Sequence, residues 1–72
     1  MTVDRVTEFS STSEQSFEDS IDQGIQRATS TLSNVQSVWI KDMNVMIENG
    51  NISAYKVNMA ITFVLEEGEQ PG

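Results

Sequence analysis

The sequence predicts an α+β fold with the element order β-α-β-β, in which a three-stranded antiparallel sheet wraps on one helix. Apolar residues recur at helical spacing between residues 17 and 32, and they alternate with polar residues beyond residue 34. An Asn-Gly pair, Asn49-Gly50, divides the alternating region into two segments. Because Asn-Gly between alternating segments favours a tight hairpin, the last two strands are expected to be antiparallel neighbours.

The first strand is predicted over residues 2–10, where Val3, Val6 and Phe9 stand among polar residues. Valine is β-branched and therefore favours a strand. The hydroxyl-rich residues 10–13 that follow are typical of a helix start, because a hydroxyl oxygen can accept a hydrogen bond from a free backbone N–H. Two alternative pairs could form a capping box there, Thr12 with Gln15 or Ser11 with Glu14.

The helix is predicted to have roughly five turns and one narrow apolar stripe. The stripe consists of residues three or four positions apart: Phe17, Ile21, Ile25, Ala28 and Leu32. Gly24 lies beside the stripe and indicates close packing of the helix against the sheet. Ser33-Asn34 is expected to end the helix. The acidic residues of this region are expected on its solvent-exposed side: Glu14, Glu18, Asp19 and Asp22.

In the second strand, predicted over residues 35–47, the apolar residues change parity. Val38 and Ile40 share one face of a regular strand, whereas the later apolar residues Met43, Val45 and Ile47 would lie on the other. A bulge or bend near Lys41-Asp42 is therefore expected, because it would return both groups to the same face. The third strand, over about residues 52–65, places alternate apolar residues on one face: Val57, Met59, Ile61, Phe63 and Leu65.

The 72 residues suffice for one domain, which we expect at residues 1–66, followed by a disordered tail over residues 67–72. A chain this short buries only about 60% of the surface that its unfolded form exposes. It contains neither cysteine nor histidine, which excludes disulfides, thiolate or imidazole metal sites and Ser-His catalytic pairs. Association of several copies is the remaining source of stability.

Eleven acidic and four basic residues give the chain a net charge of −7. This acidic excess disfavours binding to nucleic acid and to an anionic membrane surface. No apolar segment approaches the roughly 20 residues of a membrane span. Residues 1–10 lack the apolar centre of a signal peptide, so the cytoplasm is the expected location.

One helix cannot cover both faces of such a sheet. If the apolar residues of the third strand face the helix, the other face carries Ser37, Trp39, Lys56, Asn58, Ala60 and Thr62. Trp39 can be interpreted as an aromatic anchor in a subunit interface or as a platform on which a planar ligand stacks. Asp42, at the expected bulge, could form an interface salt bridge or bind a cation or a sugar hydroxyl. The sequence contains no acid/base pair and no phosphate-binding glycine loop, so an enzyme is not expected.

A family resemblance is carried by segments distributed over the whole chain. They are Thr12-Ser13-Glu14-Gln15-Ser16-Phe17, Ile25-Gln26-Arg27-Ala28, Leu32-Ser33-Asn34-Val35, Tyr55-Lys56-Val57 and Ile61-Thr62-Phe63. In these segments and in length, the sequence from Val6 to Leu65 resembles the dodecins. The resemblance implies a hollow homododecamer that stores a small molecule without catalysis. It also implies a flavin as the cofactor (riboflavin, FMN or FAD), stacked in pairs, with Mg or Ca ions as further candidate ligands.

The same resemblance points to four residues of a ligand site: Ser37, Trp39, Asp42 and Lys56. Ser37 occupies the position of the family's flavin-stacking tryptophan, and Trp39 lies two residues further on the same face. Lys56 occupies the position of a glutamine that binds the edge of the flavin ring, and Asp42 matches an acidic residue near the ribityl chain. Some dodecins lack the flavin tryptophan, and a calcium-binding type is among them. The alternative function is therefore a cation-binding (calcium) or structural shell without flavin.

Overall fold

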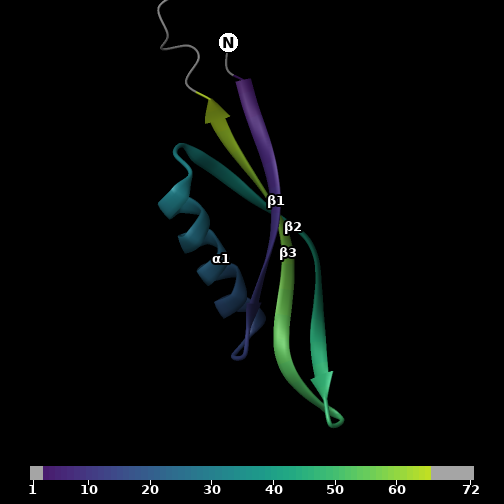
Figure 1. The fold of residues 1–72 in the computed structure, drawn as a ribbon. Coiled ribbons are helices and arrows are strands. Elements are labelled where there is room, and N and C mark those ends of the chain that lie inside the picture. Colours follow the sequence, from purple (N-terminus) through teal and green to yellow (C-terminus); the bar gives the residue numbers. More distant parts are fainter. Residues whose placement is uncertain (1–2, 66–72) are drawn as a thin grey trace, which may run out of the picture.

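The computed structural model describes residues 3–65 and shows the predicted element order. The elements are β1 (Val3–Ser13), α1 (Phe17–Thr31), β2 (Val35–Glu48) and β3 (Asn51–Leu65). The strands form one antiparallel sheet in the order β1-β3-β2, and α1 lies along one face of it (Figure 1). The predicted fold class is thereby confirmed. The predicted domain end at residue 66 and the predicted tail, residues 67–72, lie outside the described residues.

Strand β3 forms the centre of the core because it pairs with a neighbour on each side. Its alternate residues Val57, Met59 and Ile61 are completely buried, and Phe63 is 9% exposed. Ala28 of α1 joins this core, and five partly buried residues pack around it: Phe9, Leu32, Val35, Val38 and Leu65. Within residues 3–65, no helix is long and apolar enough to cross a membrane.

The boundary between β1 and α1 differs from the prediction. Strand β1 does not end at residue 10 but continues to Ser13, which pairs with Tyr55 of β3. Both predicted capping boxes are therefore wrong, since Ser11 and Thr12 lie within the strand. The helix has 15 residues, which is about four turns rather than five.

Ser16 is the N-cap of α1, and its hydroxyl accepts a hydrogen bond from the backbone N–H of Asp19 at 3.0 Å. The Ser13 hydroxyl fixes the connection between β1 and α1. It accepts a hydrogen bond from the backbone N–H of Gln15 at 2.9 Å and donates one to the Asp19 carboxylate at 2.6 Å. Glu18 and Asp19 in the first turn place negative charge at the positive end of the helix dipole. At the other end, α1 ends at Thr31 with Leu32 as its C-cap, directly before the predicted stop Ser33-Asn34, and Asn34 adopts a φ of 58°.

Small residues form the side of α1 that touches the sheet. Ser20, Gly24 and Ala28 are buried, whereas the larger residues of the predicted stripe are only half-buried: Phe17, Ile21, Ile25 and Leu32. The Ser20 hydroxyl donates to the backbone carbonyl of Ser11 at 2.7 Å. A Cβ atom at Gly24 would lie 2.5 Å from Met59 Cε, which confirms the predicted close approach.

The bulge and the hairpin are both found where the sequence predicts them. Pairing passes from Ile40–Met59 to Asp42–Asn58, so Lys41 is the extra residue of β2. Because of this residue, Val38, Ile40, Met43 and Val45 all lie on the helix side of the sheet. Asn49 and Gly50, with φ angles of 54° and 80°, form the two-residue turn between β2 and β3.

Candidate functional site

All four predicted site residues lie on the sheet face that points away from α1, which we call the open face. Residues directly opposite each other on neighbouring strands share a face, so the register defines its rows. Four rows of this face span all three strands, in order along β3: Val6–Thr62–Ser37, Glu8–Ala60–Trp39, Ser10–Asn58–Asp42 and Thr12–Lys56–Asn44.

Trp39 is the largest exposed side chain of the open face. It is 72% exposed and lies opposite Ala60, whose methyl group is too small to cover an indole ring. Its neighbours Val38 and Ile40 are half-buried on the helix side, which confirms the predicted orientation of Trp39. The indole therefore offers a large aromatic surface that residues 3–65 leave uncovered.

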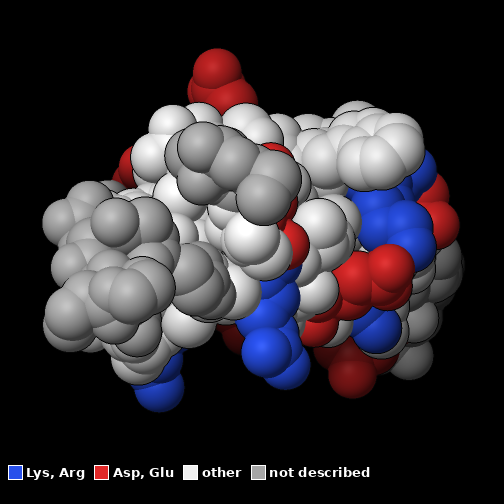
Figure 2. All heavy atoms as spheres, turned by 90° about the horizontal axis from the view of Figure 1, so that it is seen from above, with Lys and Arg blue, Asp and Glu red and all other residues white. Residues whose placement is uncertain are grey.

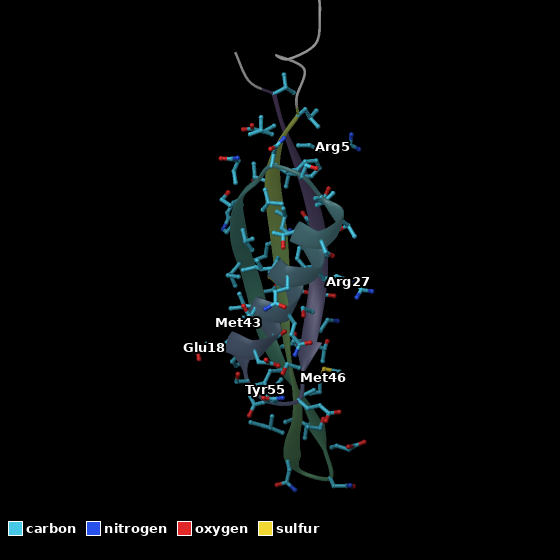
Figure 3. The ribbon with its side chains drawn as sticks, turned by 90° about the vertical axis from the view of Figure 1, so that its left-hand side faces the viewer. Arg5, Glu18, Arg27, Met43, Met46 and Tyr55 are labelled. Atoms are coloured by element: carbon cyan, nitrogen blue, oxygen red, sulfur yellow. The ribbon has the colours of Figure 1, made fainter. Side chains whose placement is uncertain are left out.

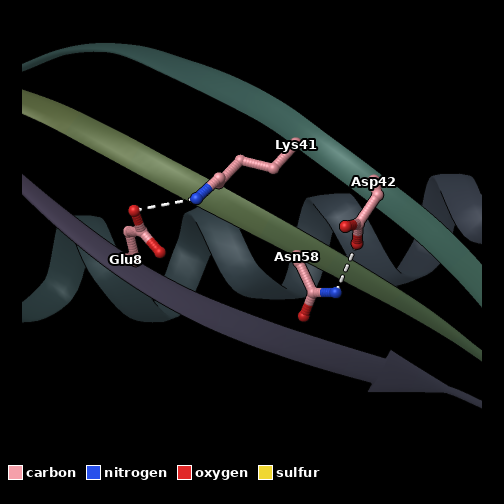
Figure 4. A network of polar contacts seen from close by, with 4 residues as sticks. All are labelled: Glu8, Lys41, Asp42 and Asn58. Carbon is pink, nitrogen blue, oxygen red and sulfur yellow. Dashed lines mark hydrogen bonds and ion pairs between the residues drawn. The ribbon is translucent and has the colours of Figure 1, made fainter.

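Two polar pairs lie beside Trp39 (Figure 4). Lys41, the extra residue of the bulge, reaches across β3 to β1, where its Nζ lies 2.9 Å from Oε2 of Glu8. Asn58 donates a hydrogen bond to Oδ1 of Asp42 at 2.5 Å. Figure 4 shows both pairs on the side of the sheet opposite the helix.

The residues of these two pairs, Glu8, Lys41, Asp42 and Asn58, line a hollow of about 300 Å³. Ser10, Phe9 and Met59 form the rest of its wall. Its wall offers carboxylate, amide and hydroxyl groups, which can bind hydroxyls of a ligand.

Lys56 differs from Lys41 in its surroundings. It is half-buried in the central strand, between Thr12 of β1 and Asn44 of β2. Among the described residues, the only salt bridge is that of Lys41 with Glu8, and Lys56 makes no side-chain hydrogen bond either. Lys56 is therefore the open-face cation whose charge is not neutralised by a neighbouring carboxylate.

The structure brings some of the predicted site residues together and keeps others apart. Trp39 and Asp42 occupy adjacent rows, whereas Ser37 and Lys56 occupy the first and the last of these four rows. On β3, Lys56 is six residues from Thr62, the partner of Ser37, which corresponds to about 20 Å along a strand. One flat ring therefore cannot touch Ser37 and Lys56 of the same chain. Glu8 is a neighbour of the site that sequence reasoning missed, because its position depends on how β1 pairs with β3.

Charges of opposite sign are mixed on the surface rather than separated. In the view from the upper end of Figure 1, basic and acidic side chains lie next to each other (Figure 2). Within residues 3–65, no three acidic side chains lie close enough together to hold a metal ion.

Large apolar side chains are also exposed near the end of the β2–β3 hairpin. Met43, Met46, Ile47 and Ile52 are between 44% and 60% exposed. Figure 3 shows Met43 and Met46 on the part of the sheet beside and beyond the start of α1. Exposed apolar side chains of this size are typical of a protein–protein contact.

The comparisons with known proteins agree on one family. The family model described as Dodecin matches residues 3–66. The structure resembles the dodecin from Streptomyces davaonensis with a TM-score of 0.85 and 29% identity, over 90% of this chain and 96% of that chain. A mutant of the T. thermophilus dodecin gives a TM-score of 0.86 and 27% identity, over 92% and 98% of the two chains.

A third structure, the calcium-chelating antigen calcium dodecin from Mycobacterium tuberculosis, shares the fold. Its TM-score is 0.78 and its identity 21%, over 97% of this chain and 99% of that chain. No curated protein matches the sequence.

Proposed function

Because the chain belongs to the dodecin family, we propose that it assembles into a homododecamer and stores a flavin on its open face without catalysis. The observation that carries this proposal is Trp39, which is 72% exposed on a sheet face that none of the described elements covers. An aromatic ring in this position can stack on the planar isoalloxazine ring of riboflavin or FMN.

The residues around Trp39 fit a flavin in size and chemistry. Ser37, in the next row, is small and leaves room beside the indole for a ring. On the other side, the amide of Asn58 and the carboxylate of Asp42 can bind the hydroxyls of a ribityl chain.

Assembly is supported by the surface that one chain leaves exposed. The helix covers one face of the sheet, and the open face and the apolar end of the hairpin remain uncovered. A closed set of identical copies would cover both surfaces. The open face would then line the contact between copies, and Trp39 would lie near a symmetry axis.

Titration with riboflavin and with FMN tests the proposal, because Trp39 is the only tryptophan and its fluorescence reports on this position alone. We expect bound flavin to quench this fluorescence. Trp39→Ala should weaken binding by roughly 1–3 kcal/mol, as for other stacked rings. Trp39→Phe is the control, because it keeps an aromatic face and should bind more tightly than Trp39→Ala.

Two outcomes would contradict parts of the proposal. If Trp39→Ala binds flavin as tightly as the native chain, Trp39 is an interface anchor and not a stacking platform. If the native chain binds no flavin, the storage function is wrong.

A cation-binding shell is the second candidate. It is supported by the exposed carboxylate of Asp42 on the open face and by the net charge of −7. Calorimetric titration with calcium in the absence of flavin tests it. Asp42→Asn should remove the binding if carboxylates from several copies meet at this position.

A further inference from the structure

The β2–β3 hairpin extends beyond the start of α1, so no helix covers its end (Figure 1). Phe17, the first residue of α1, packs against Tyr55 with a distance of 5.1 Å between the ring centroids. Beyond this contact, strand alternation places Ile47, paired with Ile52, on the same side of the sheet as the helix. These two side chains are 60% and 52% exposed, and the neighbouring Glu48 is exposed as well. The hairpin therefore ends in an apolar projection with a carboxylate beside it, which we call the knob (Ile47, Glu48 and Ile52).

A groove of about 260 Å³ lies beside the C-terminal half of α1, between the helix and β1. Its lining consists of three buried or half-buried apolar residues at the floor and three exposed residues at the rim: Phe9, Ala28 and Leu32, and Thr7, Arg27 and Thr31. Arg27 projects outward from α1 (Figure 3), and the one salt bridge found within residues 3–65 joins other residues. The groove therefore combines an apolar floor with a cation at its rim that has no ion-pair partner in this part of the chain.

The knob of a chain cannot reach the groove of the same chain. On β3, Ile52 is seven residues from Met59, the partner of Phe9, and nine residues from Ile61, the partner of Thr7. These separations correspond to about 23–30 Å along the strand. The knob and the groove can therefore meet only between two copies of the chain.

We propose that the knob of one copy docks in the groove of the next copy. Ile47 and Ile52 then lie on the apolar floor, and Glu48 pairs with Arg27 of the partner subunit. Two independent properties match across this contact, because apolar surface meets apolar surface and a carboxylate meets a guanidinium. Since the knob and the groove are different surfaces, each copy uses both, and the contact runs head to tail until it closes in a ring.

The acidic character of the chain explains why a charge pair is needed at this contact. At a net charge of −7, the copies repel each other as a whole, and only four residues of the chain are basic. A contact that places one of these cations against a carboxylate is locally attractive, and it fixes the relative position of the two copies. This inference rests on the assembly that the proposed function includes, but it does not require a flavin.

The experiment uses light scattering on dilution to measure the protein concentration at which half of the copies have dissociated. Glu48→Lys and Arg27→Glu each bring like charges together at the contact, and each should raise this concentration about tenfold or more. The double variant restores opposite charges. It also keeps the net charge of −7, because the two changes cancel. It should return to within about threefold of the native value.

Glu14→Lys is the matched control. Glu14 is exposed and lies outside both the knob and the groove, and its substitution changes the net charge as Glu48→Lys does. Both substitutions lower the overall repulsion between copies, so Glu14→Lys should not weaken the assembly. Only the loss of a specific partner makes Glu48→Lys weaken it.

The outcomes separate this inference from the proposed function. If Glu48→Lys weakens the assembly no more than Glu14→Lys, or if the double variant stays as weak as the single variants, the contact is wrong and the assembly itself is unaffected. If the native chain is a monomer at micromolar concentration, the proposed assembly is wrong, and the contact with it.

A further variant tests the apolar part of the contact. Ile47 is more than half exposed in the single chain, so Ile47→Ser leaves the core of that chain intact, which circular dichroism checks. We expect this variant to raise the concentration of half-dissociation about tenfold, because the isoleucine side chain loses its burial in the groove. An unchanged concentration would contradict the docking of the knob.

Discussion

Gly24 determines how closely α1 approaches the sheet. A Cβ atom there would lie 2.5 Å from Met59 Cε and 3.1 Å from both Phe9 Cε2 and Ser11 Cβ, and Met59 is completely buried. We therefore expect Gly24→Val to lower the free energy of unfolding by about 1–3 kcal/mol, as overpacking does. Thr29→Val is the matched control on the exposed side of the same helix and should stay within about 0.5 kcal/mol. Urea unfolding at one fixed protein concentration measures both variants, and equal effects would contradict the steric explanation.

The start of α1 shows why single residues near an element boundary are hard to predict. Each serine or threonine between residues 10 and 16 is a good N-cap by its own chemistry. The choice of Ser16 depends on how far β1 continues, and this depends on its pairing with β3 up to Tyr55. The pairing of β1 with β3 joins residues that are distant in sequence, so no local sequence pattern can predict it.

The strands show which irregularities a sequence can predict. The bulge at Lys41 is predictable because the apolar residues on its two sides differ in parity. The sheet has two further register shifts, near Gln36 and near Ser53. The shift at Ser53 has a similar signal, since Ile52 has the opposite parity to Val57 and the other buried residues of β3. Gln36 lies at the start of β2, where too few apolar residues precede it to define a face.

The β2–β3 hairpin depends on the backbone conformation of its turn. Gly50 has a φ of 80°, and no atom lies within 4 Å of the position where a Cβ would stand. The cost of a side chain there is therefore conformational and not steric, in contrast to Gly24. We expect Gly50→Val to destabilise the protein by about 1–2 kcal/mol, the cost of a left-handed residue. Gly50→Asn should cost clearly less, because asparagine tolerates this region. Equal thermal unfolding midpoints for the two variants would contradict this explanation.

The open face could be predicted from the sequence only in part. Strand parity places Ser37, Trp39 and Lys56 on one face, and the structure agrees. The sequence does not predict how far apart the rows of Ser37 and Lys56 lie. It also does not predict the contact of Lys41 with Glu8. Both depend on the register across three strands.

The charge of the complete assembly should make its stability depend on salt. Twelve copies at −7 each would carry about −84, and repulsion between like charges opposes their association. We expect light scattering to give a mass of about twelve times 8.0 kDa at micromolar concentration.

The thermal midpoint of dissociation should rise with sodium chloride, because screening weakens the repulsion between the acidic copies. Magnesium or calcium should raise it further at equal ionic strength if carboxylates of several copies meet at the contacts. A folded monomer of 8.0 kDa, or a midpoint that is independent of salt and of both cations, would contradict this account.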